Sequence, residues 1–304
     1  MRRIPLPRHG VALLRSLTLI TLHGVVCAVA AAQCRPPKNS NEAKLLAFYG
    51  MPIVFSADPT SVAAPTSAPT LRLSMEGAYV PSPPASIQRA DNCYTGHVEN
   101  TSLAKFFGRP RLSVTFANGL GAEVSYLPPV KIADAKPDLF SAAAWLTRSV
   151  TGDIHMTGRV NMTRGSVHGP ITCPKSGLQQ TDAQAPCYGT NESDDEFRPD
   201  MYGGELIASF VPSSTTARFG VQAGVGVNLL RPRFAVDFSD LLGGRDRTRI
   251  EVNLTRVTGL LGATMRLTQR CQVATQGYTS FGDGATVRAY LGCALLSRHD
   301  HDRR

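Results

Sequence analysis

The sequence predicts an all-β protein: an antiparallel transmembrane β-barrel of roughly 8–12 strands, most simply about 12, preceded by a short helix and a linker. Three observations predict this fold class. Apolar and polar residues alternate with a period of two in many segments after residue 70. Short and long connections alternate between those segments, and the chain begins with an export signal.

Residues 1–32 have the organisation of a signal peptide. Arg2, Arg3 and Arg8 form a basic start, residues 17–30 are mostly apolar, and small residues up to Ala32 offer a cleavage site. A transmembrane anchor is the alternative. The apolar run is shorter than the ~20 residues that a spanning helix needs, so we expect residues 1–32 to be removed on export.

Composition excludes several classes of protein. The 304 residues carry a net charge of +9, and only 18% of them are charged. Four of the positive charges are arginines in residues 1–32. The remaining excess is mild, so we expect no nucleic-acid partner. The 27 glycines and 21 prolines suit many turns and argue against a coiled coil.

Residues 33–70 are expected to hold one helix and a Pro-rich linker. Asn39 is the predicted N-cap, Glu42 follows at the capping-box spacing, and Pro52 is expected just after the helix. Residues 56–70 are rich in Pro, Thr, Ser and Ala, which is typical of a linker.

Residues 71–296 form the predicted barrel domain, and residues 297–304 form a polar tail. The alternation that is typical of half-buried strands is clear in 71–79, 112–116, 122–126, 153–163, 217–228, 250–255, 261–268 and 287–293. Weaker patterns predict strands at 139–149, 203–212, 233–238 and 272–280.

The connections between these strands alternate in length. Asn118-Gly119 is a tight hairpin signal, and the links at 151–152 and 212–214 are also short. The segments 80–110, 127–138 and 164–202 are long. This alternation is typical of membrane barrels with short turns on one side and long loops on the other.

In such a barrel the apolar face of each strand contacts lipid and the polar face lines the lumen. The polar face mixes basic and acidic side chains, so we expect mutual neutralisation, with an anion-selective pore as the alternative. The predicted lumen-facing residues are Arg72, Glu76, Glu123, Asp153, His155, Arg159, Arg218, Arg249, Glu251, Arg266 and Arg288.

Six cysteines remain after the leader, an even number that suggests disulfides in an exported protein. Cys173 and Cys187 close a short loop, and Cys271 and Cys293 fall on neighbouring strands. The pair Cys34–Cys93 then remains, and no cysteine spacing predicts a metal site.

No catalytic motif is present, and we expect neither an enzyme nor a cofactor. His155 with Thr157 is similar to the His and hydroxyl pair of lipid-modifying barrels, which leaves a lipid-acting hydrolase as one alternative. The stretch 191–200 holds five acids and offers a site for divalent cations, with a solvated loop as the simpler interpretation.

Together the export signal, the strand pattern over 71–296 and the loop alternation resemble bacterial outer-membrane β-barrel proteins. The resemblance implies a place in the outer membrane, contact with its lipid, and a structural or porin-like role with no assigned solute. The N-terminal segment would plug the barrel or stay periplasmic. The other alternative is a soluble, disulfide-bonded β-barrel or sandwich that binds a ligand or partner in the periplasm or outside the cell.

Overall fold

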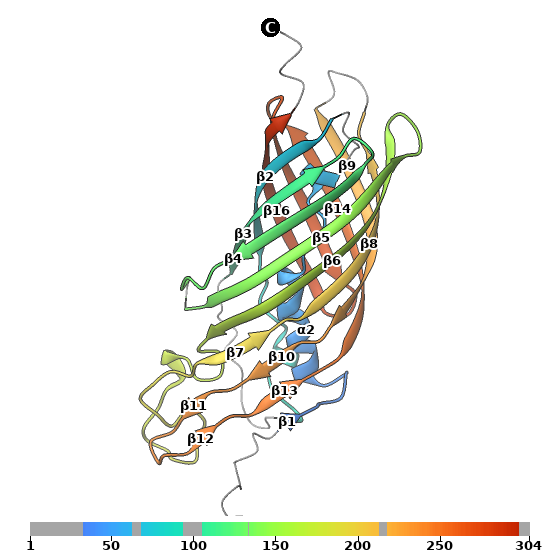
Figure 1. The fold of residues 1–304 in the computed structure, drawn as a ribbon. Coiled ribbons are helices and arrows are strands. Elements are labelled where there is room, and N and C mark those ends of the chain that lie inside the picture. The colour runs from blue at the N-terminus through green and yellow to red at the C-terminus, as the bar shows by residue number, and fades with distance from the viewer. Residues whose placement is uncertain (1–32, 63–67, 94–104, 133, 213–217, 298–304) are drawn as a thin grey trace, which may run out of the picture.

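The computed structural model describes residues 33–62, 68–93, 105–132, 134–212 and 218–297. Ten long antiparallel strands form a closed barrel, because β16 pairs with β2 and β6 pairs with β8 (Figure 1). The all-β barrel prediction is confirmed, and the preferred number of twelve strands is slightly too high. The wall strands are β2 (Thr70–Tyr79), β3 (Phe106–Thr115), β4 (Leu120–Leu127), β5 (Lys136–Ser149), β6 (Ile154–Gly169), β8 (Met201–Phe210), β9 (Phe219–Leu230), β14 (Leu254–Arg266), β15 (Cys271–Ser280) and β16 (Gly284–Ser297).

Two segments that were predicted as barrel strands, 233–238 and 250–255, account for the difference in number. Their strand residues lie mainly in β10 (Arg233–Ala235) and β13 (Arg249–Glu251), which with β7 (Asp195–Arg198) and β1 (Gln33–Cys34) continue the barrel sheet from the last residues of β6. We call these four strands the external extension. Alternation marks a half-buried strand in either place, so it cannot distinguish the extension from the barrel wall.

The two ends of the barrel differ. One end has short connections and the end of β16; the other has the long connections, the external extension and the short turn between β15 and β16 (Figure 1). The long connections include η1 (Ala85–Ile87), η2 (Lys175–Gly177) and the hairpin of β11 (Phe238–Ser239) and β12 (Arg245–Asp246). In membrane barrels short turns are periplasmic and long loops external, so we call the long-loop end the outer mouth.

The barrel has an inverted distribution of polarity. Apolar side chains such as Met75, Val225 and Leu261 point outward and are 53–68% exposed. Charged side chains such as Glu76 and Arg288 point inward and are at most 2% exposed. An apolar exterior around a polar interior is the arrangement of a barrel whose solvent is lipid.

All three disulfides join the cysteines as paired above: Cys34–Cys93, Cys173–Cys187 and Cys271–Cys293. Cys271 and Cys293 are register partners on β15 and β16. Cys34 fastens the start of the described chain to the long β2–β3 connection at the outer mouth.

The N-terminal segment enters the barrel from the outer mouth. Helix α2 (Asn41–Ile53) lies in the mouth, and the chain then passes into the lumen as far as α3 (Pro59–Val62) (Figure 1). The predicted N-cap, Asn39, is wrong by one residue, because Ser40 accepts the N–H of Ala43. Pro52 lies inside the helix rather than after it.

Within the described residues no helix has the length and apolar character to cross a membrane. The leader 1–32 and all but the first residue of the tail 297–304 lie outside the described residues, so their predicted roles remain predictions.

Candidate functional site

The centre of the lumen holds four arginines that point inward from three parts of the wall. Arg109 and Arg111 lie on β3, Arg159 on β6 and Arg288 on β16. Each side chain is at most 2% exposed. Alternation along each strand directs these side chains inward, where each guanidinium needs a partner because burying an unpaired charge is very costly.

Three glutamates on the wall supply part of that pairing. Glu76 accepts hydrogen bonds from Arg109 (2.7 Å), Arg111 (2.8 Å) and Arg288 (3.0 Å). Glu123 accepts from Arg111 and Arg159, and Arg159 also bonds to Glu205 at 2.8 Å. The result is one continuous charged network in which every arginine contacts at least one carboxylate.

The same arginines bind the backbone of the inserted chain, residues 51–62, which we call the plug. Arg288 donates to the carbonyls of Met51 and Val54, and Arg109 donates to those of Ile53 and Val54. The carbonyls of the next three residues accept from Arg159 (2.6 Å), Arg111 (2.7 Å) and Gln276 (3.0 Å). The extended backbone of the plug therefore finds in the wall the hydrogen bonds that secondary structure normally supplies.

Phe55 lies at the centre of this arrangement and is 1% exposed. The guanidinium carbons of Arg111, Arg109 and Arg159 lie 4.1, 4.9 and 5.3 Å from its ring centroid. Cation–π contacts of this kind are strongest where water is excluded. Together with the buried charges, this packing closes the lumen to solvent at this level.

Asp58 fixes the part of the plug that lies deepest in the lumen, away from the outer mouth. It accepts hydrogen bonds from the backbone N–H and the hydroxyl of Thr60, both at 2.8 Å, and from Ser74 of the wall at 2.6 Å. Ser61 contacts Ser113, and Thr157 donates to the carbonyl of Val62. The plug thus contacts the wall along its whole described length.

The predicted lumen residues fall into three groups. Glu76, Glu123, His155, Arg159 and Arg288 are buried in the lumen, and Arg72 is half-buried there. Arg218, Arg266 and Asp153 lie at or near the short-turn end instead. Arg249 and Glu251 were wrongly assigned to the lumen, because they lie in β13 of the external extension, where Glu251 bonds to Gln33 and Arg35.

The prediction omitted two of the four central arginines. Arg109 lies between Gly108 and Pro110, a stretch that resembles a turn, so the predicted strand began at residue 112. The alternation itself places Arg111 opposite Leu112, on the polar face, and one further step backwards would have placed Arg109 there too. Glu205, an acid of the same polar face in the 203–212 pattern, belongs to the network as well.

His155 does not pair with Thr157 in the way a hydrolase would need. Thr157 bonds to Thr147 at 2.8 Å, and His155 Nδ1 instead lies 3.0 Å from the hydroxyl of Ser149. His155 is 6% exposed and points into the lumen rather than toward lipid. This geometry does not favour a lipid-acting enzyme.

The acids of residues 191–200 are engaged within the external extension. Asp195 accepts hydrogen bonds from the N–H of Thr172 and Asp237 and from the Ser193 hydroxyl. Glu196 pairs with Arg198. No group of three potential ligands able to hold a metal ion occurs among the residues described, and cation binding here remains a prediction.

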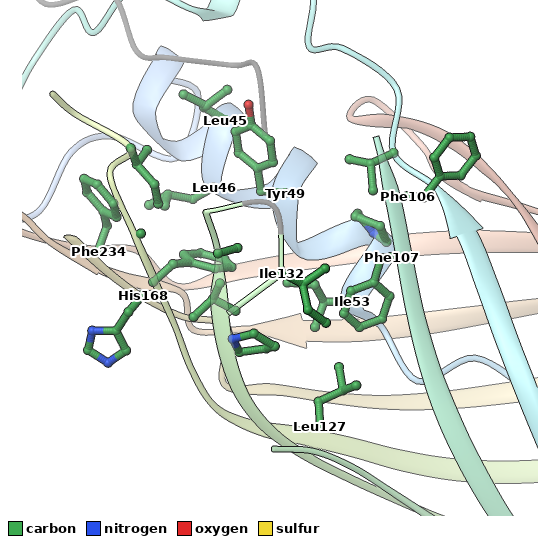
Figure 2. A pocket seen from close by; sticks show the side chains of 18 of the residues that line it. Leu45, Leu46, Tyr49, Ile53, Phe106, Phe107, Leu127, Ile132, His168 and Phe234 are labelled. Carbon is green, nitrogen blue, oxygen red and sulfur yellow. The ribbon is translucent and has the colours of Figure 1, made fainter. Parts of the chain in front are cut away.

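A second feature lies on the outer-mouth side of the charged network, between helix α2 and the wall. It is an apolar cavity of about 180 Å³, which we call the mouth cavity. Figure 2 shows Leu45, Leu46 and Ile53 of the helix facing Phe107 and Leu127 of the wall across this space. Phe197, Phe234 and Ile250 of the external extension complete the lining.

No pattern in the sequence indicates the mouth cavity. Its lining comes from α2, the wall and the external extension, segments far apart in the chain. Ile53 lines the cavity, and its backbone carbonyl accepts a hydrogen bond from Arg109 of the charged network. The apolar cavity and the charged network therefore share one boundary.

Glu42 is the acidic residue among the cavity's lining residues. One carboxylate oxygen, Oε1, accepts the N–H groups of Asp91 (3.1 Å), Asn92 (2.7 Å) and Cys93 (2.8 Å). These bonds, with the Cys34–Cys93 disulfide, hold the β2–β3 connection against the start of α2. The capping-box residue of the sequence prediction thus fixes a long loop instead of capping its own helix.

Comparison with known proteins finds no matching family model and no matching curated sequence. Solved structures that match include the attachment invasion locus protein Ail of Yersinia pestis, with a TM-score of 0.31, 10% identity, and coverage of 74% of this chain and 95% of that one. The toluene transporter TodX of Pseudomonas putida matches with a TM-score of 0.34, 11% identity and coverage of 76% and 70%. The translocator domain of the autotransporter NalP from Neisseria meningitidis matches with a TM-score of 0.37, 11% identity and coverage of 76% and 90%.

These three are bacterial outer-membrane β-barrels. Their similarity is too low to transfer any role to this chain. The closed wall, the apolar exterior and the charged interior are the observations that matter here. The protein has the architecture of a bacterial outer-membrane β-barrel, and no narrower family is indicated.

Proposed function

We propose that the protein binds a small, uncharged, apolar molecule at the outer mouth of an outer-membrane barrel whose lumen its own N-terminal segment closes. The observation that carries this proposal is the mouth cavity. Concave, mostly apolar spaces with few polar groups are the usual form of small-molecule sites. The alternative of a freely open, porin-like pore is disfavoured by the four arginines that bind the plug.

The size of the cavity limits the ligand. At about 180 Å³ it is close to the engineered protein cavity of about 150 Å³, lined by Leu, Ile and Phe, that takes up benzene. A single aromatic ring or a short hydrocarbon fits such a space. A sugar or an amino acid would leave its polar groups unpaired against Leu46, Phe107 and Leu127, at a cost of about 1–3 kcal/mol each.

The test is binding of fluorobenzene, followed by ¹⁹F NMR, to the full chain in lipid nanodiscs. The wild type should show saturable binding above protein-free nanodiscs. Ala135 lines the cavity, and Ala135→Trp should fill it and weaken binding at least tenfold. Ala144→Trp is the matched control, because Ala144 lies exposed on the outward face of β5.

Two results would overturn the proposal. One is wild-type binding that does not exceed partitioning into protein-free nanodiscs. The other is equal binding by the wild type and Ala135→Trp, when both proteins show the mobility shift on boiling that is typical of folded barrels.

A further inference from the structure

We propose that the ligand of the mouth cavity enters sideways from the membrane, through a split in the wall between β3 and β4. This inference rests on the proposed function and adds the source of the ligand, which is a small hydrocarbon dissolved in the bilayer. It is carried by the pairing of the two strands, by two prolines, and by the residues that the cavity and the split share.

The ladder between β3 and β4 is short. It comprises four residue pairs, from Thr115↔Gly121 to Leu112↔Val124, although both strands continue beyond it. β3 stays paired with β2 as far as Phe106, and β4 stays paired with β5 as far as Leu127. The regular pairing of β3 with β4 therefore ends partway along both strands, while each strand keeps its other neighbour further toward the outer mouth.

Pro110 explains where the ladder stops. At the hairpin, the N–H of Phe116 donates to the carbonyl of Leu120 at 2.8 Å, so even-numbered residues of β3 direct their backbone groups toward β4. The next even position beyond Leu112 is Pro110, opposite Tyr126. Proline has no N–H to donate, so this bond cannot form.

Pro128 lies at the corresponding place on the other side of the split. Continuing the register places residue 128 opposite Gly108, and Pro128 also lacks an N–H. An unpaired backbone group costs several kcal/mol in contact with hydrocarbon, so a split in a membrane barrel is expensive unless its donors are removed. The two prolines remove one donor from each edge of the split.

The mouth cavity extends to this split. Phe107, Gly108 and Leu127 line the cavity and belong to the two separating strands. Figure 2 shows Phe107 and Leu127 among the side chains that surround the cavity. Phe106 of β3 and Ile132 of the β4–β5 connection also line the cavity and are 74% and 56% exposed, so part of its lining lies at the surface of the molecule.

The position of the split favours lipid as the source of the ligand. Phe106 packs edge-on against Tyr79 with ring centroids 5.8 Å apart, and Tyr126 lies on the opposite edge with its hydroxyl donating to Asp138. Outward aromatic residues with a polar neighbour mark the level where a barrel meets the membrane surface. At that depth an apolar solute is far more concentrated in the bilayer than in water.

The experiment measures how fast fluorobenzene exchanges with the cavity, by ¹⁹F saturation transfer in nanodiscs. Gly108 faces outward at the split, and the nearest atom to an added Cβ is the carbonyl oxygen of Glu76 at 3.5 Å, an ordinary contact. Gly108→Phe should slow both association and dissociation at least tenfold; because Gly108 also lines the cavity, the affinity of the variant is measured separately, and a changed affinity without slower exchange does not count as support. Gly277→Phe is the control, because Gly277 faces outward on β15 and its Cβ would meet only the carbonyl oxygen of Leu261, at 3.9 Å.

A second pair of variants closes the split covalently. Pro110→Cys with Tyr126→Cys, joined by a short bifunctional thiol reagent, should slow exchange as well. Leu112→Cys with Val124→Cys joins two residues that are already register partners and should leave the rate unchanged after the same treatment.

The outcomes separate this inference from the proposed function. Wild-type binding with an exchange rate that neither Gly108→Phe nor the first cross-link changes would show that the ligand enters from water, and the mouth cavity would remain the binding site. No saturable binding by the wild type would overturn the site and its lateral entrance together.

Discussion

Arg111 shows how single residues hold this molecule together. Its guanidinium bonds to Glu123, Glu76 and the carbonyl of Ser56, and it lies 4.1 Å from the ring centroid of Phe55. Wall, network and plug therefore meet at one side chain. Breaking a buried ion pair by removing one partner leaves an uncompensated charge, which is far more costly than losing a surface pair.

We expect Arg111→Met to lower the free energy of unfolding by about 3–5 kcal/mol, because Glu76 and Glu123 lose a buried partner. Urea unfolding in lipid vesicles measures this change. Arg198→Met is the control: its pair with Glu196 lies in the external extension with the Arg198 side chain 47% exposed, and the loss should stay below about 1 kcal/mol. Equal losses for the two variants would contradict the central role of Arg111.

At this scale the sequence identifies residue type and face better than it identifies partners. Alternation placed Glu76, Glu123, Arg159 and Arg288 on the inward face. It could not reveal that Arg159 and Arg288 also donate to the backbone carbonyls of the plug, because every residue has a carbonyl and the sequence does not show which ones lie near an arginine. Arg109 was missed because local turn signals concealed the start of its strand.

The external extension illustrates what decides structure at the scale of an element. Its strands are two to four residues long and come from four distant segments, so no local pattern predicts their association. One buried carboxyl group joins three of the chain segments around β7. Asp195 on β7 accepts hydrogen bonds from Thr172, Ser193 and Asp237.

Burial raises the pKa of Asp195 above its ordinary value of 3.8, an effect that outweighs the opposing hydrogen bonds. A carboxyl group whose pKa is higher in the folded state contributes stability that is fully present below pH 3.8. That contribution is lost as the pH rises through the folded-state pKa.

We therefore expect the wild-type extension to lose stability relative to Asp195→Asn as the pH rises from about 4 to about 7. Hydrogen exchange at the amides of Phe197 and Phe234, compared between the two proteins at each pH, measures the difference. A difference that is the same at every pH would contradict the assignment to Asp195.

The strand predictions show the same limit, which is that local pattern identifies strands better than it fixes their boundaries and neighbours. Most wall strands follow the period of two closely, and β2, β4 and β15 lie within about two residues of their predicted bounds. The boundary between the predicted strands 250–255 and 261–268 was misplaced, because β13 ends at Glu251 and β14 runs unbroken from Leu254 to Arg266. Glycine in a strand is tolerated there because both neighbouring strands supply full ladders.

For the whole molecule, the closed wall and its inverted polarity were predictable and the path of the N-terminal segment was not. The sequence left open whether residues 33–70 plug the barrel or stay outside it. Composition could not decide, because the plug is held by backbone hydrogen bonds to wall arginines rather than by a recognisable apolar face. With the plug in place the lumen is closed, and the mouth cavity is the candidate ligand site on the outer side.

The central claim, that the plug closes the lumen, is tested most directly by the accessibility of one atom. Ser56 is fully buried beside Arg288 and Gln276, and the cysteines from residue 34 onward are all in disulfides. In the full chain in nanodiscs, Ser56→Cys should resist a water-soluble maleimide until the barrel is unfolded by boiling. Ala117→Cys, in the exposed β3–β4 turn, should react at once. Modification of residue 56 in the folded barrel as fast as residue 117 would mean that water fills the lumen, and the account of a closed barrel would be wrong.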